Sequence, residues 1–266
     1  MNASRRLWVT EVGPEGGAVV VLVHGSMDRA SGMRGVARRL EDEFRVVLYD
    51  RRGYGRSRSV GGPYGIATQV DDLVEVLQGR PAVVFGHSLG GDIALAAAGR
   101  PDLVRAVGAY EPPMPWEPWW PTGTAGGEVV RLAEVGGPEA TAAAASMFMR
   151  RMIGDARWER LPQSTRADRE AEGAALVGEL ADLRKRPPFD PDRITVPVLL
   201  AYGERGARHH HDGARVLAER FEVGGPQPRA ELVEVPGAEH GIHFQQPAAF
   251  ADLVRRLVAM AAVTEP

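Results

Sequence analysis

Short apolar runs rich in valine alternate with segments of helical pattern along this chain. The runs span 18–25, 44–50, 81–87, 103–111, 196–204 and 230–237. Each is nearly continuous in hydrophobicity and bounded by turn residues, which is typical of strands buried on both faces of a sheet. Helical patterns lie between the runs at 32–43, 67–79, 90–99, 213–222 and 247–262. This alternation predicts an α/β fold with a mostly parallel central sheet flanked by helices, and RLWVTEVG near the N-terminus can add an antiparallel edge strand.

One interval breaks this alternation. Between the run that ends near Glu111 and the run that starts near Val196, about 80 residues contain no convincing strand pattern. They open with PPMPWEPWWPTG, which disfavours helix, and continue with helical patterns. Because a structureless insert of this length would be unusual, we expect a helical cap at 112–192 that covers the functional site. The core is then built from 1–111 and 193–266.

The composition narrows the classes of function. The 266 residues carry a formal net charge of −3 and no basic block, so we expect no nucleic-acid partner. There is no cysteine, which excludes disulfides, thiolate metal sites and a cysteine nucleophile. No apolar segment reaches about 18 residues, and the N-terminus lacks a signal-peptide pattern. We expect a soluble cytoplasmic protein with a small-molecule substrate, no membrane partner, no cofactor and no bound metal.

The stretch VVFGHSLGG places Ser88 where a predicted strand ends and a predicted helix begins, with Gly86 and Gly90 on either side. A serine in a loop is ordinarily a turn residue or a helix cap. The G-x-S-x-G spacing suits a nucleophile elbow, in which a tight turn projects the hydroxyl and the glycines relieve clashes. The following helix points its N–H groups at the same place, which favours developing negative charge. We therefore predict that Ser88 is a nucleophile.

A serine hydroxyl needs a general base, and a histidine later in the chain can supply it. The stretch VEVPGAEHGIHF places His240 just after a predicted strand and turn, so we predict His240 as the base. His243 lies three residues further on and is predicted to be a pocket or structural residue. We interpret the histidines at 209–211 as exposed loop residues. We expect no metal site there, because three adjacent side chains cannot all face one ion.

An oxyanion hole needs two N–H donors aimed at the reacting oxygen. One candidate is the N–H of Leu89, directly after the predicted nucleophile. The other comes from the loop VLVHGSMD, where a turn at Gly25 directs the N–H of Ser26 to the site, with Met27 as the neighbouring alternative. We interpret His24 in the same loop as a structural hydrogen-bonding residue.

Four motifs carry a family resemblance: HGS at 24–26, DRRGYGRS at 50–57, GHSLGG at 86–91 and GAEH at 237–240. In order and spacing they resemble the α/β-hydrolase fold superfamily over nearly the whole chain outside the predicted cap. The resemblance implies that fold and serine hydrolase chemistry. It is much less specific for the substrate, because the fold supports many chemistries.

The acid of the expected catalytic triad departs from the family pattern. Relatives often carry it in a G-x-x-D loop, and the corresponding fourth position here is Gly206. Two glutamates remain open as replacements: Glu111 at the end of the preceding core strand, and Glu204 within the loop. Asp212 is a third candidate, although it is more typical of a helix N-cap. We favour Glu111, since a strand end is rigid support, and expect its carboxylate within hydrogen-bond reach of His240.

Taken together, the residues and the resemblance imply a serine hydrolase that cleaves an ester or lactone, or next a thioester, of a bulky apolar substrate through an acyl-enzyme. A serine at the elbow argues against dehalogenase or epoxide hydrolase activity. An acyltransferase or cyclase using the same acyl-enzyme and a non-catalytic ligand-binding member of the fold stay open. The pocket candidates from the cap are apolar and large: Trp116, Trp119, Trp120, Met147, Phe148 and Met149.

Overall fold

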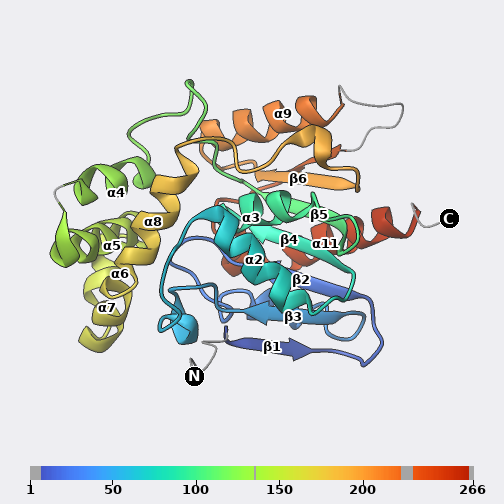
Figure 1. Ribbon diagram of the computed structural model, residues 1–266, viewed down its shortest axis with the longest axis horizontal. Coiled ribbons are helices and arrows are strands. Elements are labelled where there is room, and N and C mark those ends of the chain that lie inside the picture. Colours follow the sequence, from blue (N-terminus) through green and yellow to red (C-terminus); the bar gives the residue numbers. More distant parts are fainter. Residues whose placement is uncertain (1–6, 135, 223–229, 264–266) are drawn as a thin grey trace.

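The computed structural model describes residues 7–134, 136–222 and 230–263. These residues form a seven-stranded sheet with the strand order β1-β3-β2-β4-β5-β6-β7 (Figure 1). The strands are β1 (Val9–Val12), β2 (Val19–Val23), β3 (Arg45–Tyr49), β4 (Ala82–His87), β5 (Val104–Tyr110), β6 (Val198–Gly203) and β7 (Ala230–Val235). Only β1, paired with β3, is antiparallel to its neighbour within this sheet. The predicted mostly parallel sheet with an antiparallel N-terminal edge strand is confirmed.

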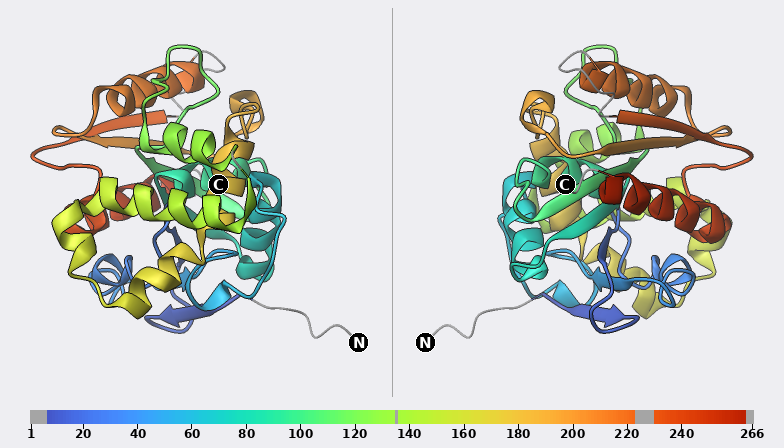
Figure 2. Two further views of the ribbon diagram at one scale, coloured as in Figure 1. Left: turned by 90° about the vertical axis from the view of Figure 1, so that its left-hand side faces the viewer. Right: turned by 90° about the vertical axis from the view of Figure 1, so that its right-hand side faces the viewer.

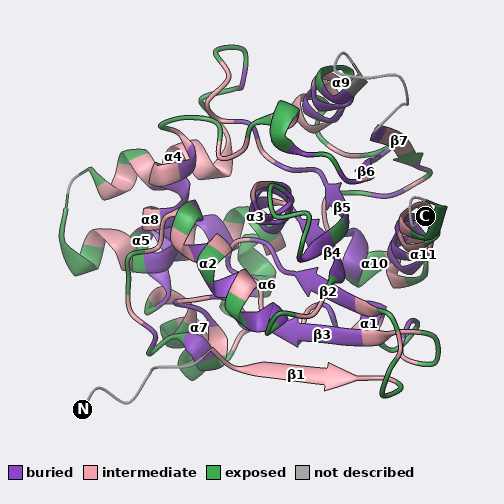
Figure 3. Cartoon of the chain, turned by 45° about the vertical axis from the view of Figure 1, so that its right-hand side comes forward, coloured by how far each residue is buried: buried purple, intermediate pink, exposed green. Residues whose placement is uncertain are grey.

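The apolar runs form strands because their alternate side chains enter two different hydrophobic layers. In β2, Val21 packs into one cluster of buried residues, whereas Leu22 packs into the other. The central strands are accordingly buried on both faces (Figure 3). The prediction of burial on both faces is wrong for β7, which lies at the sheet edge and leaves Leu232 and Glu234 exposed.

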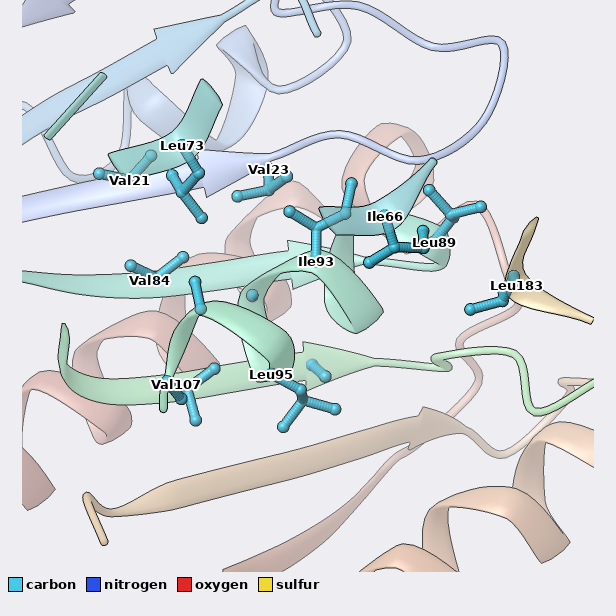
Figure 4. Close-up of a cluster of buried hydrophobic side chains, with 14 of the residues drawn as sticks. Val21, Val23, Ile66, Leu73, Val84, Leu89, Ile93, Leu95, Val107 and Leu183 are labelled. Atoms are coloured by element: carbon cyan, nitrogen blue, oxygen red, sulfur yellow. The ribbon is translucent and has the colours of Figure 1, made fainter. Parts of the chain in front are cut away.

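Helices cover both faces of the sheet. On one face lie α2 (Ile66–Leu77), α3 (Leu89–Ala97) and α9 (Arg208–Glu222), and on the other lie α1 (Arg34–Ala37), α10 (Ile242–Gln245) and α11 (Pro247–Val263). Short 3-10 helices, η1 (Gly55–Ser57) and η2 (Pro191–Arg193), lie in the connections. Figure 4 shows the first layer, where apolar side chains of α2 and α3 pack against β2 and β4.

Two helices differ from their predicted bounds. The helix expected at 32–43 is reduced to the single turn of α1, because hydrogen bonds such as Leu40 N to Ala37 O (2.9 Å) span three residues rather than four. α9 begins at Arg208, five residues before the expected start at 213. The histidines at 209–211 therefore belong to the first turn of a helix, and their interpretation as loop residues is wrong.

Between β5 and β6 the chain forms the helices α4 (Ala125–Ala133), α5 (Gly137–Ile153), α6 (Asp155–Glu159), α7 (Gln163–Glu170) and α8 (Gly173–Leu183). We call these five the insertion helices. They lie together across one end of the sheet (Figures 1 and 2). This is the end where the parallel strands have their carboxyl ends, because the insertion helices contact the connections that leave β2 and β3. Asp182 of α8 accepts the N–H of Ile66 (2.9 Å), which lies after β3, and Glu172, just before α8, pairs with Arg29 (2.5 Å), which lies after β2. In the described part of the chain, no helix combines the length and apolarity that a membrane span requires.

Candidate active site

Ser88 occupies the turn between β4 and α3 in a backbone conformation that few residues adopt, with φ +53° and ψ −130°. Such a conformation is strained for a residue with a side chain and must be held by its surroundings. The Ser88 N–H donates to Tyr110 O (2.8 Å), and the Ser88 carbonyl accepts from Gly91 N (2.7 Å). A Cβ at Gly86 would lie 2.0 Å from the carbonyl oxygen of Gly90, so position 86 needs glycine. The turn leaves Ser88 half-buried at the carboxyl edge of the sheet.

His240 and Glu111 meet at this edge. His240 follows β7 after a short turn, and its Nδ1 lies 2.6 Å from Glu111 Oε2. The Glu111 side chain is fully buried, whereas the His240 side chain is 33% exposed. A buried carboxylate at this distance fixes the tautomer with hydrogen on Nδ1 and leaves Nε2 as the basic nitrogen. The structure thus contains the hydrogen bond expected from the sequence.

The position of Glu111 explains why glycine stands at 206. Glu111 directly follows β5 with φ +47°, and its Oε1 accepts the N–H of Gly203 at the end of β6 (3.0 Å). A Cβ at Gly206 would lie 2.3 Å from this same Oε1. Position 206, where the family resemblance implies the acid, therefore has no room for a side chain, because the Glu111 carboxylate occupies that space.

The two alternative acids point elsewhere. Glu204 Oε2 accepts the N–H of Gly237 (2.7 Å) and so stabilises the turn that precedes His240, without contacting its ring. Asp212 lies inside α9 rather than at its N-cap and pairs with Arg208 (3.4 Å) and Arg215 (3.9 Å). Of the three candidates, Glu111 is the one that the structure brings to His240.

His87, the residue between Gly86 and Ser88, holds the backbone of His240 by a hydrogen bond. Burial lowers the pKa of His87 well below its ordinary value, helped by the neighbouring His243 and His240, so the ring is neutral. Its Nε2 donates to the carbonyl oxygen of His240 (2.7 Å), and Tyr110 Oη donates to the carbonyl oxygen of Glu239 (2.9 Å). These two bonds hold the backbone that carries the histidine. The elbow motif contained this residue, but nothing in its spacing predicted the contact.

The first turn of α9 forms the other wall around His240. The rings of His210 and His240 are nearly parallel, with centroids 4.8 Å apart. Burial lowers the pKa of His210 well below its ordinary value, so this neighbour adds no positive charge. Trp120 packs edge-on against His209 and His210, with centroids 4.7 and 5.4 Å away. The sequence analysis did not predict that His210 contacts His240, because it placed the run of three histidines in a loop.

The predicted oxyanion loop forms a tight turn at residues 25–28. Asp28 N approaches Gly25 O (3.4 Å), and Met27 has φ +57°. His24 is fully buried, and burial, together with the charge of Arg51, lowers its pKa to about 3. Its neutral ring uses both nitrogens: Nδ1 donates to Gly25 O (2.8 Å), and Nε2 accepts from Arg51 N (2.9 Å). His24 thus has the structural hydrogen bonds expected of it.

The pocket candidates occupy different surroundings. Trp120 contacts His210, which packs on His240, and Trp119, which is 40% exposed, contacts Trp120. His243 is buried rather than open to a pocket, and its Nε2 lies 3.1 Å from Asp28 Oδ2. The remaining candidates belong to, or pack against, the same hydrophobic cluster as Trp120. Trp116 packs on Phe189, Phe148 and Met149 are buried in the hydrophobic core, and Met147 lines a surface cavity with Ala143, Arg150 and Asp155.

One group in the described residues has the composition of a metal site. Potential ligand atoms of Glu111, His210 and His240 lie within 4.8 Å of one another. Both Glu111 oxygens already accept hydrogen bonds, however, from His240 Nδ1 (2.6 Å) and from Gly203 N (3.0 Å). The arrangement therefore favours an oriented histidine base over a metal centre.

Comparisons with known proteins show the family and the fold of this chain. The model of the Alpha/beta hydrolase family matches residues 20–253. The magnesium-chelatase 30 kDa subunit of Rhodobacter capsulatus is 36% identical over 105 residues, 38% of this chain and 37% of that protein. Lipase LipV of Mycobacterium tuberculosis is 36% identical over 110 residues, 40% of this chain and 41% of that protein. In both relatives the aligned part is less than half of the protein's length.

A solved structure extends the likeness to nearly the whole chain. A thermophilic esterase from Thermogutta terrifontis is similar with a TM-score of 0.74, covering 96% of this chain and 93% of that chain. The sequence identity is 21%, so this similarity shows a shared fold.

Proposed function

The chain belongs to the alpha/beta hydrolase family, and from that premise we propose that it is a serine hydrolase acting on an ester or lactone. Ser88 is the nucleophile, His240 the general base and Glu111 the acid that orients the base. The observation that carries the proposal is the 2.6 Å contact between His240 Nδ1 and the buried Glu111 carboxylate. A histidine held in this way can take a proton on Nε2, which is what a serine nucleophile requires.

The reaction then runs through two tetrahedral intermediates. Ser88 Oγ attacks the substrate carbonyl while His240 Nε2 takes its proton, and the carbonyl electrons move to the oxygen. His240 returns the proton to the leaving alkoxide, which departs as an alcohol and leaves an acyl-enzyme. Water repeats the sequence and releases the acid. Through both steps the Glu111 carboxylate stabilises the imidazolium.

The oxyanion is held by two backbone N–H groups, those of Leu89 and Ser26, with Met27 as the alternative donor. Leu89 is the first residue of α3, so its N–H is among those without a partner inside the helix, and the helix dipole adds favourable potential. Ser26 lies in the turn at 25–28, which faces the elbow closely: a Cβ at Gly25 would lie 3.1 Å from Ser88 Cβ. These two observations support the assignment of both donors.

The insertion helices act as a cap that selects the substrate. The connection between β5 and α4 places Trp120 and Met114 near α9, where a Cβ at Gly213 would lie 3.4 Å from each of them. This apolar wall beside His210 supports a bulky apolar acyl or alcohol part. An ester or lactone is favoured over an amide because an alkoxide leaves more readily.

The first test is covalent labelling. A fluorophosphonate probe should attach to Ser88, as located by mass spectrometry, and Ser88→Ala should prevent labelling. On a panel of esters, lactones and thioesters, Ser88→Ala should lose several orders of magnitude in kcat while keeping the parent's Tm. Adding alcohols or amines and analysing the products separates hydrolysis from acyl transfer. Ester hydrolysis by Ser88→Ala within about tenfold of the parent would contradict the proposal.

A further inference from the structure

A fully buried carboxylate joins the insertion helices to the turn at 25–28. Glu179 of α8 has 0% exposure. Its oxygens accept hydrogen bonds from Ser26 Oγ (2.7 Å), Arg51 Nη1 (2.8 Å), Tyr54 Oη (2.6 Å) and Gln69 Nε2 (3.1 Å). A buried charge is tolerated only when it is paired and hydrogen-bonded, as here. The same constraint means that its partners cannot move freely.

Arg51 passes this constraint to the peptide that carries the Ser26 N–H. Its guanidinium is 1% exposed and donates to the carbonyls of His24 (2.8 Å) and Gly25 (3.0 Å). The Gly25 carbonyl and the Ser26 N–H belong to one planar peptide unit and point in opposite directions. Whatever holds the carbonyl therefore sets the direction of the N–H. Glu179 acts on this unit twice, through Arg51 and through the Ser26 hydroxyl.

The turn needs such support because it is strained. Met27 has φ +57°, which costs a residue with a side chain about 1–2 kcal/mol. Its carbonyl accepts a hydrogen bond from Arg169 Nη1 of α7 (2.9 Å). Two side chains of the insertion helices, Arg169 and Glu179, thus hold the two residues at the centre of the turn.

We propose that Glu179 is a positioning residue that aims the Ser26 N–H at the reacting oxygen, so that docking of the insertion helices completes the oxyanion hole. This rests on the proposed function. The carboxylate does not touch substrate, and its effect is transmitted through Arg51 and the Ser26 hydroxyl. Its loss should therefore weaken binding of the transition state more than binding of the ground state.

The test compares two substitutions one turn apart on α8. Glu179→Gln keeps the shape but removes the charge that pairs with Arg51. We expect kcat on an ester to fall about 10- to 100-fold with KM within about threefold, since loss of a whole oxyanion donor costs about 100- to 1,000-fold. The affinity for a trifluoromethyl ketone, whose hemiketal oxygen occupies the hole, should fall in parallel. Asp182→Asn, which loosens the α8 contact to Ile66 N without touching the turn, should leave kcat within about threefold.

Ser26→Ala provides the second variant, because it keeps the N–H and removes only the hydroxyl that contacts Glu179. It should lower kcat about three- to tenfold, and the double variant should lose no more than Glu179→Gln alone. If Glu179→Gln does not fold, this variant decides. Unchanged kcat and ketone affinity in Ser26→Ala, or a Glu179→Gln effect confined to Tm or KM, would overturn the proposal. Labelling of the parent at Ser88 tests the proposed function separately, so the two failures are distinguishable.

Discussion

The two halves of the candidate site are held by different parts of the molecule. His240 and Glu111 depend on the ends of β5, β6 and β7, through bonds such as Glu111 Oε1 to Gly203 N (3.0 Å). The turn at 25–28 depends on side chains of α7 and α8, through Arg169 and Glu179. The first half is thus supported largely by the sheet, and the second by Arg51 of the core together with charged contacts from the inserted segment. A different insertion could therefore alter the turn at 25–28, which carries the proposed oxyanion donor, while His240 and Glu111 stay in place.

The largest effect is expected in the half held by the sheet. Glu111→Gln should lower kcat about a thousandfold or more, because the amide no longer stabilises the imidazolium and can favour the wrong tautomer. Glu204→Gln, which alters only the contact to Gly237 N, should stay within about tenfold of the parent. Steady-state kinetics with one ester measures both. Equal losses in the two variants would show that the acid is not Glu111.

Low pH should lower the stability of the protein through protonation of His24, which is bonded to the turn at 25–28. Its pKa of about 3 lies well below the ordinary 6.5, so between these values the unfolded chain binds more protons than the folded chain. The free energy of unfolding therefore falls as the pH is lowered through this window, by about 1.4 kcal/mol per unit from this group at most. Urea unfolding at several pH values measures the slope.

His24→Gln is the matched variant for that measurement. Glutamine does not titrate in this window, so its unfolding free energy should depend less steeply on pH than that of the parent. Buried His87 and His210 have lowered pKa values as well and keep part of the slope in the variant. An unchanged slope would show that His24 is not the buried neutral group inferred here.

Substitution of Gly206, which lies against the Glu111 carboxylate, should lower stability and activity, but less than Glu111→Gln lowers activity. The Cβ of Gly206→Ala would meet Glu111 Oε1 at 2.3 Å and the Gly203 carbonyl oxygen at 2.9 Å, so the carboxylate has to shift. We expect a loss of about 1–3 kcal/mol in stability and a reduced kcat. Gly123→Ala is the control, because its Cβ would have no neighbour within 4 Å. Denaturant unfolding and ester kinetics should separate the two variants, and equal behaviour would argue against the crowding.

The smallest effect is expected at the exposed contact between the insertion helices and the core. Arg58 and Asp168 pair at 2.7 Å with side chains 44% and 56% exposed. Exposed ion pairs add little to stability, since both partners remain hydrated. Asp168→Asn should leave Tm and kcat within experimental error of the parent. A measurable loss of kcat would show that surface contacts, and not only the buried ones, set the position of the insertion.

Local patterns in the sequence were sufficient to predict the sheet and the need for glycine beside the turn at Ser88. Alternating apolar runs predicted β2 to β6, because burial on both faces requires an apolar residue at every position of the strand. Gly86 is needed for the same reason that the motif suggested, a close approach to Gly90 O. The choice of Glu111 also rested on local information, namely glycine at 206 and a carboxylate at a strand end. The catalytic roles of these residues stay predictions until the kinetics are measured.

Local patterns failed where a residue's role depends on what docks against it. The run at 209–211 looked like a loop, yet it opens α9 and places His210 against His240. For His243 the sequence left a pocket role and a structural role open, and the structure buries it beside Asp28. Periodicity describes how a segment folds by itself, while burial is decided by its neighbours.

What the sequence by itself determined is therefore the α/β sheet, the strained turn at Ser88 and the preference for Glu111, a carboxylate at a strand end, where the usual loop position holds Gly206. Each rests on residues that lie close together in the chain or on the residue type at one position. Only the tertiary structure decided the contact between Ser26 and Glu179, which lie 153 residues apart in the chain. A buried carboxylate is stable only where donors from several segments converge, and that convergence exists only once the insertion has docked on the sheet.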